Sequence, residues 1–465
     1  MKTIQTDVAI IGTGTAGMTA YRAAARTGQK VLLINGGPYG TTCARVGCMP
    51  SKLLIAAADA AHAVRTTRDF GVYVNGDVEI DGVAVMDRVR RERDRFVGFV
   101  LEDVEGFPET DRLVGYARFT GPNTLQVEDH TQIQFKSAVI ATGSAPYIPE
   151  SFKTLGDLAI VNDDVFDWQD LPESVVVFGP GVIGLELGQA LSRLGVRVRV
   201  FGVSGSLAGL TDPVVREEAK TIFQKDFYLD TKAEILETSR VDDQVRVRYV
   251  NLDGQEVTES FDYALMATGR RPNLAVLDLS KAGIEVDESG LPSFNTQTMQ
   301  IEDKPVFIAG DVNGYLPLLH EAADEGSIAG LNAAKYPDVQ PGLRRAHLGI
   351  IFTDPQITTV GQGPHELVEG QYVTGSVSFS NQGRSRVMLK NRGVLHLYAE
   401  KQTGRFLGAQ MVGPSAEHLG HLLSWAVQQN MTISQMLQMP FYHPVIEEGL
   451  RTALRQTSAA LKKAD

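Results

Sequence analysis

The two cysteines of this 465-residue chain, Cys43 and Cys48, lie close together in the segment GTTCARVGCMPSK. Two thiols this near each other favour a redox-active disulfide, and the alternatives are a metal site or two inert core thiols. A closed zinc site needs four ligands, and the sequence offers neither a second cysteine pair nor a histidine cluster beside this one. We therefore predict a redox switch and no metal.

A helix is predicted from Pro50 onward, since proline is tolerated in a first helical turn and apolar residues recur at helical spacing after it. Both cysteines then lie near a helix N-terminus, where a thiolate is stabilised. Positions five apart in an ideal helix are separated by roughly 8 to 9 Å between Cα atoms, whereas a disulfide needs about 4.4 to 6.8 Å. The backbone between Cys43 and Cys48 must therefore depart from a regular helix.

The elements before the cysteines predict a dinucleotide-binding fold. An apolar strand over residues 8–11 leads into a G-x-G-x-x-G turn, an alanine-rich helix and a second strand over residues 31–34. The turn glycines are Gly12, Gly14 and Gly17. Glycines let a pyrophosphate approach the backbone, and the N-terminus of the following helix carries partial positive charge.

The same order of elements recurs later in the chain. A strand over residues 175–178 is followed by Gly179, Gly181 and Gly184, a helix over residues 185–194 and a strand over residues 196–201. Two separate dinucleotide sites are therefore expected, one for a bound and one for an exchanging dinucleotide, as in a flavoprotein that uses a nicotinamide coenzyme.

Three further apolar strands end on small or acidic residues. One ends with Ala141, Thr142 and Gly143, a second reaches Gly269, and the third ends with Gly310 and Asp311. Taken alone, Asp311 is either an ordinary turn residue or an acceptor for a ribityl hydroxyl group.

From about residue 346 the glycine fingerprints stop. The pattern predicts antiparallel strands over residues 349–353, 371–379 and 394–400, and helices over residues 416–429 and 446–461. Such a domain, without a dinucleotide signature, is typical of an oligomerisation unit.

The composition limits the partners of the protein. The net charge is −12 and no run of lysine and arginine stands out, so we expect neither a nucleic-acid nor a membrane partner. The first apolar run is too short for a signal core or a membrane span, and we expect a cytoplasmic protein.

Together, the two fingerprints, the cysteine spacing and a His-Pro motif near residue 443 resemble the pyridine nucleotide-disulfide oxidoreductases, most nearly the dihydrolipoamide dehydrogenases. The resemblance implies an α/β protein with two Rossmann-like domains and a C-terminal α+β dimerisation domain, active as a homodimer with FAD and NAD, NADP not being excluded. The implied domains are 1–150 for FAD, 151–275 for NAD(P), 276–345 for the second part of the FAD-binding region, and 346–465 for dimerisation.

The resemblance also implies residue roles. Cys43 is the interchange thiol that attacks a substrate disulfide, and Cys48 is the thiol nearest the flavin, forming a charge-transfer complex with it. His443, with Glu448 five residues later, is the acid/base pair, because imidazole titrates near neutrality and the carboxylate fixes its tautomer. Lys52 resembles the family's lysine beside the flavin, and Glu186 resembles the carboxylate paired with it. The implied cofactor-binding residues are Gly12, Gly14, Gly17, Asn35, Thr42, Lys52, Ala141, Thr142, Gly143, Gly179, Gly181, Gly184, Glu186, Gly269, Gly310 and Asp311.

Several positions depart from the family pattern. The acid expected at the end of the second strand of each fold, where it binds a ribose 2′-hydroxyl, is Asn35 in the first fold and Gly202 in the second. Residues 203–206 offer no arginine for a 2′-phosphate either. Arg45, between the thiols, stands where relatives usually carry asparagine and adds positive charge.

The leading functional prediction is a dihydrolipoyl dehydrogenase that passes electrons from dihydrolipoamide through Cys43 and Cys48 and FAD to NAD. The alternative is an NAD(P)H-dependent flavoprotein reductase of another disulfide, a quinone or an oxidant in stress defence. A further alternative is a redox-sensing FAD-binding module.

Overall fold

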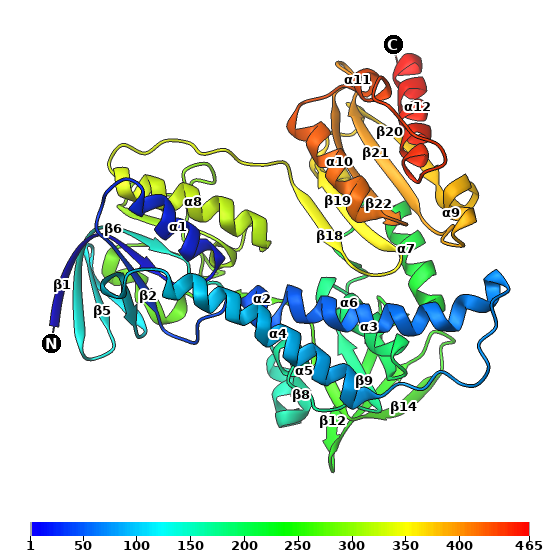
Figure 1. The fold of residues 1–465 in the computed structure, drawn as a ribbon, viewed down its shortest axis with the longest axis horizontal. Helices are drawn as coiled ribbons and strands as arrows, with labels where there is room; N and C mark the ends of the chain where they lie inside the picture. The colour runs from blue at the N-terminus through cyan, green and yellow to red at the C-terminus, as the bar shows by residue number, and fades with distance from the viewer. Residues whose placement is uncertain (1, 465) are drawn as a thin grey trace. The chain divides into compact units, whose positions relative to one another are not determined.

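The computed structural model describes residues 2–464, and the chain divides into two compact units (Figure 1). The first unit contains Met1–Pro50, Val89–Tyr147 and Arg270–Arg344, and the second contains Ser51–Arg88, Ile148–Gly269 and Arg345–Asp465. Helices α3 (Cys48–Thr66) and α4 (Gly82–Glu105) each contain residues of both units. The domain limits given above stay predictions.

The first unit is built on a seven-stranded sheet in the order β3-β2-β1-β6-β5-β4, with β17 paired to β6. Strand β6 shows why the sheet is mixed. Its first half alternates between buried and more accessible residues beside antiparallel β5, and its second half is continuously buried, where it lies between parallel β1 and β17. The strands are β1 (Lys2–Ile11), β2 (Val31–Asn35), β3 (Arg112–Val114), β4 (Ala117–Gly121), β5 (Thr124–Val127), β6 (Thr131–Ile140) and β17 (Val306–Ile308).

Two helices of the first unit, α1 (Thr15–Ala25) and α8 (Leu319–Lys335), lie side by side against this sheet (Figure 1). They approach closely because α8 presents glycines to α1. A Cβ added at Gly326 or Gly330 would lie 2.2 Å from a backbone oxygen of α1. The remaining elements are α2 (Thr42–Val46), the strand pair β7 (Ser144–Pro146) and β16 (Arg270–Pro272), and short 3-10 helices at Glu109–Asp111, Ala275–Leu277, Leu279–Ala282 and Asp311–Asn313.

The second unit contains a five-stranded parallel sheet in the order β11-β10-β9-β15-β8. Its central strand β9 reads SVVVF and is buried throughout, as expected for a strand covered on both faces. The elements are β8 (Ala159–Ile160), β9 (Ser174–Phe178), β10 (Arg197–Phe201), β11 (Tyr228–Asp230), β15 (Tyr263–Met266), α5 (Asn162–Val165), α6 (Val182–Arg193), α7 (Pro213–Asp226), the antiparallel strands β12 (Glu234–Val241), β13 (Gln244–Val250) and β14 (Glu256–Phe261), and 3-10 helices at Thr67–Phe70 and Glu150–Leu158.

The C-terminal part of the second unit is a five-stranded antiparallel sheet in the order β18-β19-β22-β21-β20. Its helices α10 and α12 contribute apolar side chains to the same buried core as the strands. The elements are β18 (Leu348–Ile351), β19 (Gln356–Gly361), β20 (Tyr372–Ser378), β21 (Val394–Glu400), β22 (Phe406–Gly413), α9 (Gly383–Val387), α10 (Ala416–Gln428), α11 (Ile433–Leu437), α12 (Glu447–Ala464), and 3-10 helices at Pro364–Glu366 and Phe379–Asn381.

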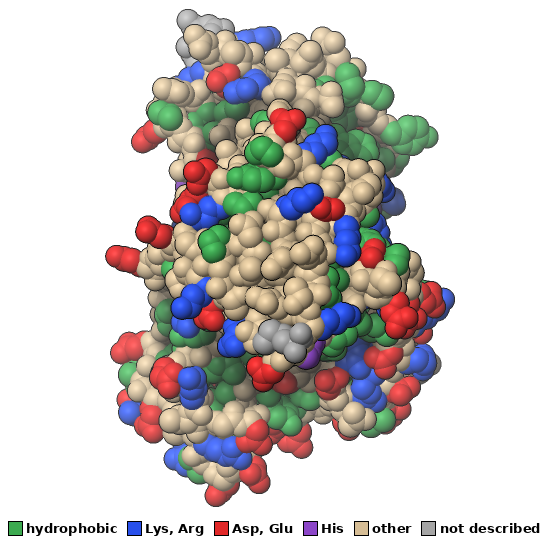
Figure 2. All heavy atoms as spheres, turned by 90° about the vertical axis from the view of Figure 1, so that its left-hand side faces the viewer, with side chains coloured by type: hydrophobic (Ala, Val, Ile, Leu, Met, Phe, Trp, Pro, Cys, Tyr) green, Lys and Arg blue, Asp and Glu red, His purple; other side chains and the backbone are tan. Residues whose placement is uncertain are grey.

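The predicted fold class is confirmed. Each G-x-G-x-x-G turn connects a parallel strand to a helix, and the predicted C-terminal strands and helices correspond to β18, β20, β21, α10 and α12. Acidic and basic side chains are interspersed over the face of the molecule in Figure 2. Within residues 2–464, no helix is long and apolar enough to cross a membrane.

A buried polar network ties α7 to the C-terminal sheet. Asp212 caps α7 by accepting hydrogen bonds from the Val214 and Val215 amides, at 2.9 and 3.1 Å. Its other oxygen lies 2.8 Å from Nδ1 of His396 and accepts a 2.8 Å hydrogen bond from the Tyr398 hydroxyl. Desolvation opposes ionisation, but these hydrogen bonds lower the pKa of Asp212 to about 2.

Asp212→Asn tests this network. Because the folded-state pKa lies below the ordinary value of 3.8, the carboxylate stabilises the fold above pH 3.8 and loses this effect as the pH falls toward 2. We expect Asp212→Asn to lower the free energy of unfolding at pH 7 by about 1 to 2 kcal/mol, and its deficit to shrink below pH 3.8. Denaturant unfolding at both pH values measures this. Asp253→Asn, at an exposed turn, is the control, and an unchanged deficit at acid pH would contradict the account.

Candidate active site

The first glycine loop leaves open space at a helix N-terminus. A Cβ added at Gly12 would lie 2.2 Å from the carbonyl oxygen of Ala141, and one at Gly17 would lie 1.9 Å from that of Gly12. Gly12 also has a φ of +111°, which disfavours other residues. A Cβ added at Gly14 would meet nothing within 4 Å, and Gly14 is the N-cap of α1 with no side-chain cap. The first and third glycines therefore serve packing, and the second leaves room and free amide groups for a phosphate.

The second glycine loop repeats this arrangement. Added Cβ atoms at Gly179 and Gly184 would lie 2.2 and 2.0 Å from the carbonyl oxygens of Ala267 and Gly179. Gly181 has open space around it and is the N-cap of α6, again without a side-chain cap. Both loops fit the pyrophosphate of a dinucleotide, one in each unit.

The turn that carries Asp311 is held by a buried carboxylate. Glu325, which is fully buried on α8, accepts hydrogen bonds from the Gly310 amide at 2.8 Å and from Asn313 Nδ2 at 2.7 Å. Its other oxygen lies 3.0 Å from Arg344, which also pairs with buried Glu321 at 2.9 Å. Burial raises the pKa of Glu325 despite these partners. Glu325 was not among the predicted site residues, although its i, i+4 spacing from Glu321 on an otherwise apolar helix face was a signal.

Asp311 itself is connected to the neighbouring strand ends. It accepts a 3.0 Å hydrogen bond from the Ser144 hydroxyl, and Ser144 in turn accepts one of 2.8 Å from Arg270. Thr142 donates to the Asn273 carbonyl at 2.8 Å, and Gly143 lies beside it with a φ of +68°. The structure therefore brings Thr142, Gly143, Gly310 and Asp311 together at one end of the first sheet.

The two cysteines lie at consecutive short helical segments. Cys43 is half-buried in α2, Cys48 is exposed at the first residue of α3, and Gly47 between them has φ −128° and ψ −115°. This break confirms the expected departure from a regular helix. A Cβ at Gly47 would lie 3.0 Å from the Thr42 carbonyl oxygen, so the chain folds tightly between the thiols. Thr42 itself is exposed.

Lys52 and Glu186 meet within the second unit. Lys52 Nζ lies 2.7 Å from Oε2 of Glu186, and 4.7 Å from the ring centre of Phe352. Glu186 is buried and also accepts a 2.9 Å hydrogen bond from the Phe352 amide. A buried carboxylate satisfied on both oxygens is a rigid anchor for the lysine ammonium group.

His443 and Glu448 form the other predicted pair. His443 Nδ1 lies 3.0 Å from Oε2 of Glu448, and Arg451 lies 3.2 Å from Oε1. Desolvation opposes ionisation of Glu448, but hydrogen bonds from His443 and the Val445 amide, and the charge of Arg451, lower its pKa. Because Nδ1 faces the carboxylate, Nε2 lies on the opposite side of the ring. The imidazole is highly exposed, which makes Nε2 accessible to a reactant.

Two other predicted binding residues, Asn35 and Gly269, do not take part in the hydrogen-bond network around Asp311. Asn35 ends β2, and its side-chain amide donates to the Gly37 carbonyl within the following loop. Gly269 directly precedes β16, has a φ of +109°, and has no atom within 4 Å of an added Cβ.

Comparison with known proteins agrees with this geometry. The family model of the pyridine nucleotide-disulphide oxidoreductases matches residues 6–326, and the dimerisation domain of the same family matches residues 348–454. The dihydrolipoyl dehydrogenase of Halobacterium salinarum is 30% identical over 461 residues, covering 96% of this chain and 95% of the relative. The dihydrolipoyl dehydrogenase of Staphylococcus aureus is 30% identical over 457 residues, with coverage of 96% and 95%.

Solved structures share the fold. The flavoprotein disulfide reductase RclA from Escherichia coli superposes with a TM-score of 0.82 at 22% identity, and LpdA from Mycobacterium tuberculosis with a TM-score of 0.82 at 23% identity. Each superposition covers 97% of this chain and 99% of the other. The chain belongs to the pyridine nucleotide-disulphide oxidoreductases, a family of enzymes that use FAD and NAD(P)H.

Proposed function

We propose that this protein is a dihydrolipoyl dehydrogenase that oxidises protein-bound or free dihydrolipoamide and reduces a nicotinamide coenzyme. The observation that carries the proposal is that one chain retains both the thiol pair at a helix start and a hydrogen-bonded His443–Glu448 pair. Relatives named dihydrolipoyl dehydrogenase match nearly its full length and support the same substrate.

The thiol pair exchanges electrons with the substrate. The dihydrolipoyl dithiol attacks the Cys43–Cys48 disulfide, forms its own S–S bond, and leaves two thiols on the protein. Two electrons pass in this step, and the substrate loses two protons. The chemistry that bound FAD would supply is two-electron transfer between these thiols and NAD(P)⁺, so the overall products would be lipoamide, NAD(P)H and one proton.

His443 is the proposed acid/base group. Its exposed imidazole accepts a proton from the dithiol and returns it, and ionised Glu448 holds its tautomer and stabilises the imidazolium form. Exposure of His443 on a chain with a family dimerisation domain supports a homodimer in which each histidine serves the thiols of the other copy.

The glycine loops and the charged pair are proposed to hold the cofactors. Gly12, Gly14 and Gly17, with the Gly310–Asp311 turn, bind FAD, and Gly179, Gly181 and Gly184 bind the nicotinamide coenzyme. Lys52, anchored by Glu186, supplies a fixed positive charge for the flavin.

A second candidate is an NAD(P)H-driven reductase of another disulfide or oxidant, and it is favoured by Arg45. This half-buried residue lies between the thiols, and its aliphatic stem packs over Gly40, where an added Cβ would lie 2.8 Å from its Cδ. A positive charge between the two cysteines in the sequence suits an anionic acceptor.

Cys43→Ser separates these two functions from flavin-only chemistry. Dihydrolipoamide turnover is expected to fall about 1,000-fold or more, because serine cannot form the interchange disulfide. Reduction of a quinone by NAD(P)H, which bypasses the thiols, is expected to survive, as measured by steady-state assays of both activities. Dihydrolipoamide turnover retained by Cys43→Ser would rule out the proposed thiol route.

His443→Gln tests the acid/base role. We expect dihydrolipoamide turnover to fall about 100- to 10,000-fold, the usual contribution of a positioned acid/base group. Glu448→Gln is expected to lower kcat about tenfold, because it keeps the shape but loses the charge that orients His443. His365→Gln, an exposed histidine 4.0 Å from Glu366, is the matched control. Equal kinetics for His443→Gln and His365→Gln would refute the role.

Paired glycine substitutions test the assignment of the two dinucleotide loops. Gly14→Ala and Gly181→Ala add a methyl group that meets no protein atom within 4 Å, so both variants should fold. Gly14→Ala is expected to weaken FAD retention about tenfold, and Gly181→Ala to raise the KM for coenzyme about tenfold without loss of FAD. Flavin absorbance per chain and steady-state kinetics measure the two effects. Gly98→Ala in α4 is the control, and a reversed or shared effect would contradict the assignment.

A further inference from the structure

Residue 202, the position that contacts the coenzyme ribose in the second fold, has no room for a side chain. Gly202 directly follows β10, where a Rossmann fold that binds NAD carries an acid for the ribose 2′-hydroxyl. A Cβ added at Gly202 would lie 2.6 Å from Cγ of Pro180, the proline inside the glycine fingerprint. The fingerprint itself therefore excludes an acid at residue 202.

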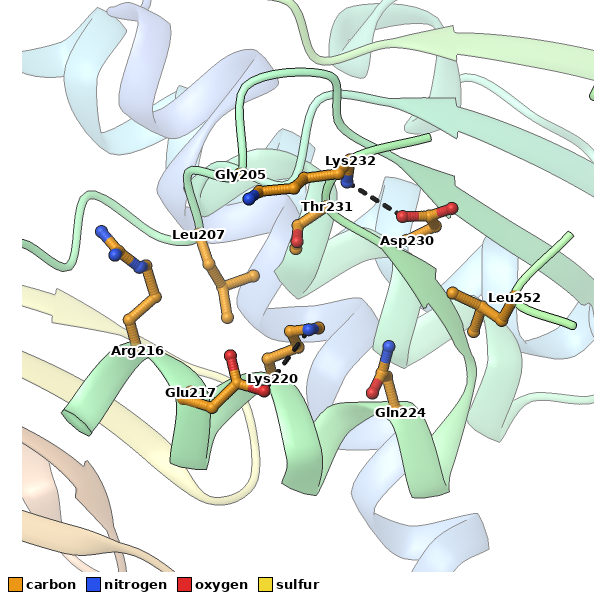
Figure 3. A pocket seen from close by; sticks show the side chains of 10 residues that line it. All are labelled: Gly205, Leu207, Arg216, Glu217, Lys220, Gln224, Asp230, Thr231, Lys232 and Leu252. Carbon is orange, nitrogen blue, oxygen red and sulfur yellow. Dashed lines mark hydrogen bonds and ion pairs between the residues drawn. The ribbon is translucent and has the colours of Figure 1, made fainter. Parts of the chain in front are cut away.

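The loop after Gly202 borders a hollow of about 240 Å³ (Figure 3). The loop is fixed at both ends, because the Gly202 and Gly205 amides donate to the carbonyls of Asp230 and Thr231, and the Ala208 amide donates to that of Pro180. The hollow thus lies beside the edge of the sheet at which the adenosine half of a dinucleotide binds.

Three cations from two consecutive elements, α7 and the segment after β11, surround this hollow. Lys232 follows β11, and Arg216 and Lys220 lie on α7 (Figure 3). Lys220 pairs with Glu217 at 3.4 Å, but neither Lys232 nor Arg216 has a carboxylate within salt-bridge distance in the described chain. Asp230 also lines the hollow, where its carboxylate accepts a hydrogen bond from the Lys232 amide at 2.9 Å. The hollow therefore carries cationic groups that lack an anion.

Lys232 is directed toward the loop by a glycine. Its side chain extends along Gly205 in Figure 3, and a Cβ added at Gly205 would lie 2.8 Å from Cε of Lys232. Gly205 also has a φ of +78°. Any other residue at position 205 would obstruct the path that brings the ammonium group to the loop.

We propose that this hollow binds the 2′-phosphate of NADP(H), so that NADP(H) binds more tightly than NAD(H). Lys232 and Arg216 pair with the phosphate, replacing the acid that Pro180 excludes from position 202. The proposal rests on the second glycine loop as the coenzyme site of the proposed function. It is independent of the identity of the dithiol substrate.

Binding of adenosine phosphates to the holoenzyme tests the proposal without any turnover. Calorimetric titration is expected to show that 2′,5′-ADP binds about tenfold or more tightly than 5′-AMP, a preference that weakens with rising salt. Lys232→Ala and Arg216→Ala should each weaken the binding of 2′,5′-ADP about tenfold. The affinity for 5′-AMP should stay within about twofold of that of the wild-type protein. In the same variants, the ratio of kcat/KM for NADPH to that for NADH should fall by a similar factor.

The control is Lys225→Ala, which removes an exposed positive charge from α7 outside the hollow. It should change the affinity for neither ligand. Equal affinity of the wild-type protein for 2′,5′-ADP and 5′-AMP would overturn the proposal. An equal loss of affinity for both ligands in Lys232→Ala would also overturn it. Inorganic phosphate that competes as well as 2′,5′-ADP would also overturn it, because the hollow would then be a general anion site. Loss of dihydrolipoamide activity alone would affect the proposed function and leave this result standing.

Discussion

The contact on which both dinucleotide folds depend is the close approach of a glycine to the carbonyl at the end of the neighbouring strand. Gly12 packs on Ala141 and Gly179 packs on Ala267, each at a distance that leaves no room for a Cβ. Gly17 and Gly184 then pack against the carbonyls of those same first glycines. This stacking fixes each following helix against its sheet and leaves the middle glycine and the uncapped helix N-terminus facing open space. The phosphate-binding geometry is thus a consequence of backbone packing, not of a specific side chain.

The charged groups of the candidate site are positioned by a different means, namely buried acids. Glu186 fixes Lys52, and Glu325 holds the turn that carries Asp311. Glu448, which is only partly buried, is kept ionised beside His443 by the hydrogen bonds and the positive charge around it. Each acid has several donors, so its partner is restrained in a single geometry. Preorganised charges of this kind cost little reorganisation during reaction, which is why they suit proton and electron transfer.

Local patterns were sufficient to predict the two dinucleotide folds and three strands and two helices of the C-terminal domain, but not α4, α7, α8 or strands such as β12, β13, β19 and β22. The two glycine turns, the continuous burial of β9 and the alternation in β20 are each visible within a few residues of sequence, because their causes are local. The break at Gly47 followed from the geometry that two nearby cysteines require. The pairing of Lys52 with Glu186, 134 residues apart, was expected only through the family resemblance.

The contacts that local patterns did not indicate depend on how separate elements pack together. Residues 203–206 alone suggested no partner for a 2′-phosphate, yet folding brings Lys232 and Arg216 to the hollow beside them. The Asp212–His396 contact joins positions 184 residues apart, and neither residue belongs to a motif. Such contacts depend on how α7 packs on two different sheets, which no short pattern specifies.

The central claim is that Cys43 and Cys48 cycle between disulfide and dithiol and exchange electrons reversibly with the nicotinamide coenzyme. Because the chain has two cysteines, whole-protein mass after anaerobic alkylation reports their state directly. The account predicts no alkyl groups on the oxidised holoenzyme and two per chain after addition of one equivalent of NAD(P)H. Equal alkylation before and after reduction by the coenzyme would contradict it.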